Sequence, residues 1–147
     1  MTDVPLATTL EVRDACLCMQ VQRAARTLAR RFDQVFRPLG LTNGQFSLLM
    51  SLNRPKPAAM GAVAGFLAMD RTTLTAALKP LLRRKLIRIL PAPEDGRTRL
   101  IGLTASGRKL LARAVPIWRA HHGALEKELG RPADALRRDL GQLSRAG

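Results

Sequence analysis

The segment from Arg71 to about Lys85, which Asp70 can cap as a helix, combines residue types that are suited to contact with nucleic acid. If Leu74 faces the core, the opposite face of the helix carries small side chains near its N-terminal end and cationic side chains toward its C-terminal end, and it has no acidic residue. The residues on or beside this face are Arg71, Thr72, Thr73, Thr75, Ala76, Lys79 and Arg83. Short threonine and alanine side chains let a helix approach base edges in the major groove, and the cations pair with phosphates. This face therefore predicts binding of double-stranded DNA.

The two runs that follow, Leu86–Leu90 and Thr98–Ile101, have the residue pattern of short β-strands. Asp95 and the glycine after it are a turn signal, so the two runs are predicted to form a β-hairpin. A hairpin placed directly after a helix-turn-helix is a wing. Arg97 near its tip is placed to enter the minor groove, where narrow A·T-rich stretches attract guanidinium groups. Asp95 can orient Arg97 through a bidentate pair.

An ordinary solvated helix and a plain exposed turn are the structural alternatives when each of these two elements is considered alone. Their adjacency favours contact with DNA, because eight basic and only two acidic residues lie between Arg71 and Arg99. Arg99, at the start of the second predicted strand, therefore joins Arg97 and Asp95 among the expected DNA-contacting residues of the wing.

The basic character extends to the whole chain. Lysine and arginine total 25 against 11 acidic residues, which gives a net charge of +14. Such an excess opposes folding through self-repulsion and indicates a polyanionic partner. Nucleic acid is the first candidate and an anionic membrane surface the second, while a genome whose codons favour arginine and alanine is the alternative explanation. Aromatic residues make up 3% and tyrosine is absent, which argues against reading single strands by base stacking.

Helical periodicity and capping signals predict the elements that must position this surface. Thr42 and Gln45 have the spacing of a capping box, and Thr104 can cap the helix that follows the wing. About three residues separate the helix beginning at Arg71 from the one before it, which is helix-turn-helix spacing. The predicted helices are Glu11–Leu39, Asn43–Leu52, Ala59–Leu67, Arg71–Lys85, Ala105–Leu129 and Ala133–Ser144.

The predicted fold is mainly α with a small β-hairpin wing (α+β), a winged helix-turn-helix with long terminal helices. Residues 1–40 and 104–147 are assigned to a helical dimerisation region and residues 41–103 to the DNA-binding region, within one compact domain. The apolar stripes of the terminal helices exceed what this small winged core can cover, so a homodimer is expected. No apolar run approaches the ~18–20 residues needed to span a bilayer. The first ten residues lack the pattern of a secretory signal, so a cytoplasmic protein without a membrane partner is expected.

Three stretches resemble the MarR family of transcriptional regulators, in a match that runs almost end to end: Leu39–Thr42, Met69–Thr75, and Asp95–Arg99 with the Leu-Thr pair and Gly107 that follow. The resemblance implies a homodimer built from the first and last helices, with two winged regions on a pseudo-palindromic operator. It also implies repression that is relieved by a small aromatic ligand or an oxidant, with a ligand cavity between the dimer helices and the winged region. Family members often carry glycine where this chain has Ala68, so the turn must avoid a left-handed conformation or accept a small penalty.

Cys16 and Cys18 lie near the start of the first predicted helix. Two residues apart on a helix they point about 200° apart, so they cannot bridge each other or share a metal while the helix persists. The resemblance places Cys18 where the organic-peroxide-sensing branch of the MarR family carries its reactive cysteine, and a helix N-terminus favours thiol reaction. That branch relies on tyrosines hydrogen-bonded to the thiol, and this chain has none. Buried structural cysteines are therefore favoured over redox sensing, and a disulfide across the dimer remains open.

The sequence shows no catalytic or metal-binding constellation. The adjacent residues His121 and His122 diverge by about 100° on a helix, and no HExxH or Ser/His/Asp arrangement is apparent. We therefore expect no enzyme activity, no cofactor and no metal. The competing hypotheses are a nonspecific architectural nucleic-acid-binding protein and a cysteine-based peroxide or thiol sensor. The expected partners are double-stranded DNA, a second copy of the chain, and a small aromatic or oxidant effector.

Overall fold

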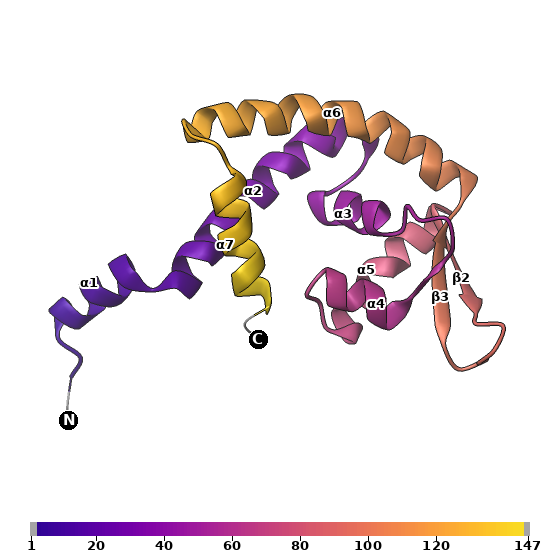
Figure 1. The fold of residues 1–147 in the computed structure, drawn as a ribbon, viewed down its shortest axis with the longest axis horizontal. Coiled ribbons are helices and arrows are strands. Elements are labelled where there is room, and N and C mark those ends of the chain that lie inside the picture. Colours follow the sequence, from indigo (N-terminus) through magenta and orange to yellow (C-terminus); the bar gives the residue numbers. More distant parts are fainter. Residues whose placement is uncertain (1–2, 146–147) are drawn as a thin grey trace.

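The computed structural model describes residues 3–145, which form a winged region and a set of long helices extending from it (Figure 1). The helices are α1 (Leu6–Ala15), α2 (Leu17–Phe36), the short 3₁₀ helix η1 (Arg37–Leu39), α3 (Asn43–Ser51), α4 (Met60–Phe66), α5 (Arg71–Arg83), α6 (Ala105–Leu129) and α7 (Asp134–Arg145). The strands β1 (Ala58–Ala59), β2 (Ile87–Pro91) and β3 (Arg99–Leu103) form one antiparallel sheet in the order β1-β3-β2. The predicted fold class, mainly α with a β-hairpin wing, is confirmed.

Helices α3, α4 and α5 pack with the sheet around an apolar core. Leu49 of α3, Leu74 of α5 and Ile101 of β3 are fully buried. Ile101 pairs with Ile89 on one side and with Ala58 on the other, so it lies at the centre of the sheet. Strand β1 was not predicted, because a two-residue strand carries no periodicity. Burying each large apolar side chain contributes roughly 1.5–3 kcal/mol, so this core holds α5 and the wing in fixed positions.

Side-chain caps fix the starts of three helices, as the sequence predicts. The Thr42 hydroxyl accepts the N–H of Gln45 (3.1 Å), and the Gln45 side chain accepts the N–H of Thr42 (3.0 Å), which completes the capping box of α3. Asp70 caps α5, and the Thr104 hydroxyl accepts the N–H of Gly107 (3.0 Å) at the start of α6. Local sequence therefore determines where α3, α5 and α6 begin.

The corner at which the chain leaves α5 is tied to the start of α6. The Thr104 hydroxyl donates to the carbonyl of Lys85 (2.7 Å), and the Thr104 N–H donates to the carbonyl of Leu86 (3.1 Å). Lys85 has a left-handed backbone with φ of 56°, a conformation that costs a non-glycine residue roughly 1–2 kcal/mol. Gly107 lies so close to the Leu86 carbonyl that a Cβ there would overlap it. These contacts couple α5 to α6.

One local prediction needs correction, and one alternative that the sequence left open is decided. The single helix predicted over Glu11–Leu39 is wrong, because the chain breaks at Cys16 (φ −69°, ψ 108°) into α1 and α2, and α1 begins at Leu6. Cys16 acts as the N-cap of α2 through a contact of its Sγ with the N–H of Met19 (3.5 Å), so α2 begins at Leu17. Ala68 has φ of 53°, so the turn before α5 accepts the left-handed penalty instead of avoiding it.

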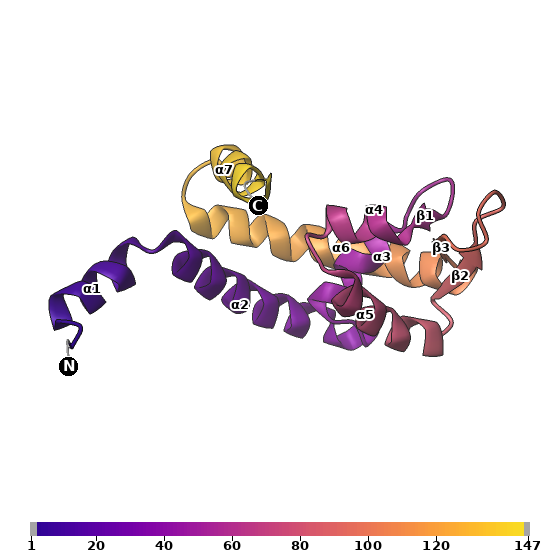
Figure 2. The same cartoon turned by 90° about the horizontal axis from the view of Figure 1, so that it is seen from below.

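We call α1, α2, α6 and α7 the helical arm. Helices α2 and α6 run side by side (Figure 2) and are joined by a two-point ion pair between Arg31 and Glu128, with N–O distances of 2.7 and 2.8 Å. This pairing lowers the pKa of Glu128 and raises that of Arg31. Helix α1 has no buried residue and projects away from the rest of the chain (Figure 1). Among residues 3–145, no helix has the length and apolar character needed to cross a membrane.

Candidate nucleic-acid interface

Helix α5 turns one face into the core and the other to solvent. Leu74, Leu78 and Leu81 are buried on the inner face. The outer residues are all exposed: Arg71, Thr72, Thr73, Thr75, Ala76, Lys79 and Arg83. The structure therefore gathers the residues predicted from α5 on one accessible surface, and their contact with DNA stays a prediction.

The threonines at the start of α5 differ in what their hydroxyl groups can offer. The Thr73 hydroxyl donates to the Asp70 carboxylate (2.9 Å), and the Thr75 hydroxyl donates to the carbonyl of Arg71 (2.8 Å). The Thr72 hydroxyl has no hydrogen-bond partner within the described part of the chain. Thr73 and Thr75 therefore present acceptor lone pairs and methyl groups outward, whereas Thr72 can both donate and accept.

Asp70 holds the first turn of α5 in place. One carboxylate oxygen accepts the N–H of Thr73 (2.7 Å), and the other accepts its hydroxyl. These hydrogen bonds lower the pKa of Asp70 below its ordinary value. The negative charge of Asp70 interacts favourably with the dipole of α5 at the N-terminus of the helix. Both carboxylate oxygens of Asp70 accept hydrogen bonds from within the protein.

We call residues 87–103 the wing, and Asp95 organises its tip. Its carboxylate accepts the backbone N–H of Arg97 (3.0 Å) and the hydroxyl of Thr98 (2.9 Å), which together lower the pKa of Asp95. The bidentate pair predicted between Asp95 and the Arg97 guanidinium is therefore wrong, because the carboxylate stabilises the turn itself. The Arg97 side chain is exposed, and among residues 3–145 it has no ion-pair partner.

Arg71, Arg97 and Arg99 line a common cleft of about 230 Å³ where α4, α5 and the wing meet. We call it the arginine cleft. The rest of its lining is uncharged: Ala59, Met60, Gly61 and Thr98. Three like charges in a lining that has no acidic residue attract an anion. The first residue of α5 and residues near the tip of the wing, which the DNA-binding prediction requires to be adjacent, therefore border one cavity.

Sequence reasoning missed two features of this region. Gly61 of α4 lies against the Arg71 guanidinium, where a Cβ would be 3.0 Å from Nη2, and only the tertiary fold brings these two residues together. Arg84, counted among the basic residues, is used internally: its guanidinium donates to the carbonyls of Gly40 (2.6 Å) and Leu39 (3.4 Å). Arg84 therefore anchors the end of α5 instead of pointing toward an external anion.

The cysteines lie at the start of α2, far along the chain from the arginine cleft. Cys16 is half-buried and Cys18 is exposed, so the expectation of buried cysteines is wrong for the single chain. The amide of Gln22 donates to Cys18 Sγ (3.1 Å). Within residues 3–145, no group of three histidine, cysteine or acidic residues is placed to hold a metal ion.

Cavities also lie between the helical arm and the winged region, around Trp118 of α6. One of about 430 Å³ is bordered by Trp118, Met50 and Phe66, and another of about 280 Å³ by Trp118, Phe36 and residues of α2. The resemblance to the MarR family implied a ligand cavity in this place. The space exists, and the ligand stays a prediction.

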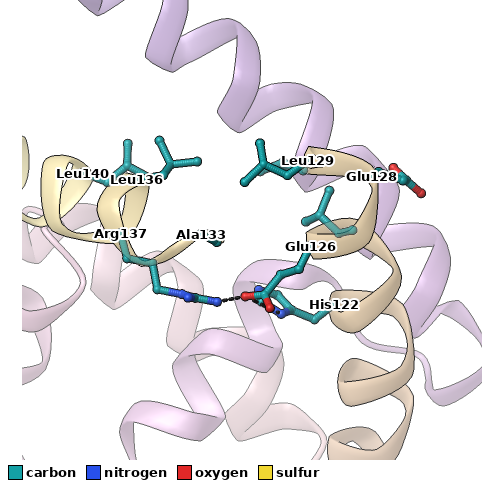
Figure 3. A pocket seen from close by; sticks show the side chains of 10 residues that line it. His122, Glu126, Glu128, Leu129, Ala133, Leu136, Arg137 and Leu140 are labelled. Carbon is teal, nitrogen blue, oxygen red and sulfur yellow. Dashed lines mark ion pairs between the residues drawn. The ribbon is translucent and has the colours of Figure 1, made fainter. Parts of the chain in front are cut away.

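A further cavity of about 410 Å³ is bounded by α2, α6 and α7 (Figure 3). Arg137 of α7 forms an ion pair with Glu126 of α6, and the Nδ1 of His122 is 3.8 Å from the same carboxylate. The leucines drawn in Figure 3, Leu129 of α6 and Leu136 and Leu140 of α7, give this cavity an apolar wall.

Comparison with known proteins gives consistent results. The sequence model described as the MarR family matches residues 41–98. The structure of the M. tuberculosis transcriptional regulator MosR in complex with DNA matches with a TM-score of 0.81 and 37% identity, over 89% of this chain and 95% of that one. The transcriptional repressor CouR bound to a 23-mer DNA duplex matches with a TM-score of 0.80 and 28% identity, over 98% of this chain and 100% of that one. CouR bound to p-coumaroyl-CoA matches equally well, with a TM-score of 0.80 and 28% identity over 92% and 96% of the two chains.

The curated relatives are also regulators of transcription. The transcriptional activatory protein BadR of Rhodopseudomonas palustris is 30% identical over 111 residues, which are 73% of this chain and 63% of BadR. The match therefore spans less than two thirds of that relative. The matched proteins are described as regulators of transcription.

Proposed function

Because the chain belongs to the MarR family of DNA-binding transcriptional regulators, we propose that it is a homodimeric cytoplasmic repressor that is released from a pseudo-palindromic operator by a small ligand or an oxidant. The observation that carries the proposal is the shared cleft of Arg71, Arg97 and Arg99, which joins the start of α5 to the wing beside an exposed, acid-free face of α5.

In this proposal α5 enters the major groove and the wing enters the adjacent minor groove. Thr72, Thr73, Thr75 and Ala76 face base edges, with the methyl of Ala76 available to a thymine methyl group. Arg71, Lys79 and Arg83 pair with phosphates, while Arg97 enters the minor groove and Arg99 lies behind it. Asp95 contributes indirectly, by holding the turn that presents Arg97.

The apolar surface of the helical arm supports the proposed homodimer. Leu17 is 66% exposed and Leu6 is 72% exposed in the single chain, which is unusual for so many apolar side chains on one set of helices. The exposed apolar residues on the arm are Leu6, Leu10, Val12, Leu17, Met19, Val21, Leu28, Leu129, Leu140 and Leu143, and Val4 lies just before α1. A second copy related by a two-fold axis would cover this surface and present two α5 helices to half-sites one helical turn apart.

A small aromatic effector is supported by the cavities that flank Trp118, which are of the size of small-molecule sites. CouR has been solved with p-coumaroyl-CoA, whose acyl group is aromatic. Release by an oxidant is the second candidate, and the exposure of Cys18 favours it. If Cys16→Ser and Cys18→Ser leave oxidant-triggered release from DNA unchanged, the cysteines are not the sensor.

Competition binding tests the proposed function against nonspecific binding. Fragments from the neighbourhood of the gene compete with random duplex at about 150 mM salt, because electrostatic binding alone is weak and salt-sensitive under these conditions. Preference for one fragment supports a specific regulator, and equal binding of all duplexes supports an architectural protein. CouR is described as a repressor and BadR as an activatory protein, so a reporter assay with and without the regulator decides the sign.

A further inference from the structure

We propose that the arginine cleft is a seat for a single phosphate of the DNA backbone, held jointly by Arg71 of α5 and Arg99 of β3. This inference rests on the proposed DNA-binding function and adds a defined site to it. The seat would fix the register of α5 against the wing on the duplex, a task that separate surface charges cannot perform.

Geometry identifies the ligand. If α5 lies in the major groove and the wing in the next minor groove, one sugar-phosphate strand must pass between them. The arginine cleft is bordered by the same two elements, Arg71 of α5 and Arg97 to Arg99 of the wing, and the strand that passes between them would therefore run along it. Its lining includes three guanidinium groups and no acidic side chain, and a guanidinium fork matches the oxygens of a phosphate.

Arg71 and Arg99 are suited to hold a phosphate because their backbones are rigid. Arg71 is the first residue of α5, directly after the Asp70 cap, and Arg99 is in the β-ladder opposite Pro91. Arg97, by contrast, lies in the loop at the tip of the wing and can reach beyond the cleft. Asp70 occupies the Thr73 N–H and places a negative charge at the start of α5, so the arginines are the cationic donors that the cleft offers to a phosphate.

Gly61 provides the space for this seat. An added Cβ would be 3.0 Å from the Arg71 guanidinium, so any side chain at this position competes with Arg71 and with an incoming phosphate. Gly65 lies on the same short helix, and a Cβ there would meet nothing within 4 Å. The two glycines therefore form a matched pair, in which one substitution fills the cleft and the other leaves it open.

The first test compares Gly61→Met with Gly65→Met on both random duplex and any preferred fragment. Neither variant changes the net charge. We expect Gly61→Met to weaken binding at least about tenfold, the cost of a lost charge-assisted contact, and Gly65→Met to bind as the parent protein does. Equal affinities of the two variants would overturn the proposal. Random duplex reports on the seat even if no fragment is preferred, which separates this result from failure of the proposed regulatory function.

The second test maps the phosphate. Single phosphates in a bound duplex are replaced in turn by neutral methylphosphonate, and affinities are measured for the parent protein, Arg71→Ala, Arg99→Ala and the control Arg113→Ala. We expect one position per half-site at which neutralisation weakens the parent and Arg113→Ala at least about fivefold, while each cleft variant changes less than twofold there. The proposal would be overturned if the affinity of Arg71→Ala and that of Arg99→Ala became insensitive to neutralisation at two different phosphates. It would also be overturned if both variants stayed as sensitive as the parent protein at every phosphate.

Discussion

Replacing Arg97 by alanine is the sharpest test of the wing as a DNA-contacting element. The Arg97 side chain is exposed, and within residues 3–145 it makes no hydrogen bond or ion pair. Its backbone N–H, which Asp95 accepts at 3.0 Å, is kept in the alanine variant. The turn should therefore survive, and unfolding free energy should stay within about 0.5 kcal/mol of the parent value, as for other surface substitutions.

The expected loss of DNA affinity is large by comparison. A hydrogen bond that involves a charged group contributes about 1.5–3 kcal/mol. The proposed homodimer places two wings on each operator, so the loss should be about 3–6 kcal/mol if the two contacts add. That corresponds to a dissociation constant raised roughly 10²- to 10⁴-fold. Arg97→Lys keeps the positive charge but loses the planar guanidinium fork, so its affinity for DNA should lie between that of the parent protein and that of Arg97→Ala.

Fluorescence anisotropy with a labelled duplex at about 150 mM salt measures the affinity, and sedimentation measures the dimer. Arg113→Ala is the matched control, because it removes an exposed arginine from α6, outside the wing and α5. An affinity for Arg97→Ala within threefold of that of Arg113→Ala would refute the assignment of the wing. Loss of the dimer in Arg97→Ala would refute it as well, because the wing would then belong to the subunit contact.

Gly107→Ala should lower the free energy of unfolding by about 1–3 kcal/mol or more, because the added Cβ would overlap the Leu86 carbonyl. Gly123→Ala on the same helix, where a Cβ meets open space, should instead raise the free energy of unfolding by up to about 1 kcal/mol, and urea unfolding measures both values. Asp70→Ala should reduce the urea midpoint at pH 7 through loss of the cap. Because folding lowers the pKa of Asp70, this difference should persist above the unfolded pKa of about 4 and vanish as pH falls through the folded value, and a constant difference across that range would contradict the assignment. Leu17→Glu should convert the proposed dimer to monomers in sedimentation, and an unchanged mass would exclude this part of α2 from the proposed interface. Cys18→Ser should abolish release by peroxide if the exposed thiol is the sensor, with ligand-induced release as the control.

The elements that carry local signals could be predicted from the sequence. The capping box of Thr42 and Gln45, the cap at Asp70 and the cap at Thr104 each depend on residues three positions apart, so the starts of α3, α5 and α6 are encoded locally. The inner face of α5 follows from the spacing of its leucines, which is why its exposed face was assigned correctly. Burial and capping act over a few residues and leave a readable pattern.

The features that were missed depend on contacts distant in sequence or on small backbone departures. The break at Cys16 lies just before Leu17, where the apolar spacing of α2 begins, and α1 has almost no amphipathic pattern, so periodicity did not reveal the break. The arginine cleft needs Gly61, Arg71 and Arg99, which only tertiary packing brings together. The partner of the Asp95 carboxylate was assigned wrongly, because a residue two or three positions away can offer either a charged side chain or a hydrogen bond within the turn. The carboxylate accepts the Arg97 N–H and the Thr98 hydroxyl, and it does not pair with the Arg97 guanidinium.

The winged region and the helical arm share one continuous set of contacts, which explains how an effector could act on DNA binding without touching α5. The rings of Phe36 in α2 and Phe46 in α3 stack with their centroids 4.5 Å apart. Phe46 in turn stacks on Trp118 of α6 (centroids 6.5 Å apart), and Trp118 stacks on His122 (4.7 Å). Two cavities border Trp118, and a ligand in either of them would contact α3 and α6 together. The start of α6 is bonded to the corner at the end of α5, and a displaced α6 therefore displaces α5. In a homodimer the two α5 helices must stay about one helical turn of DNA apart, so a small shift repeated in both subunits is enough to lose the operator.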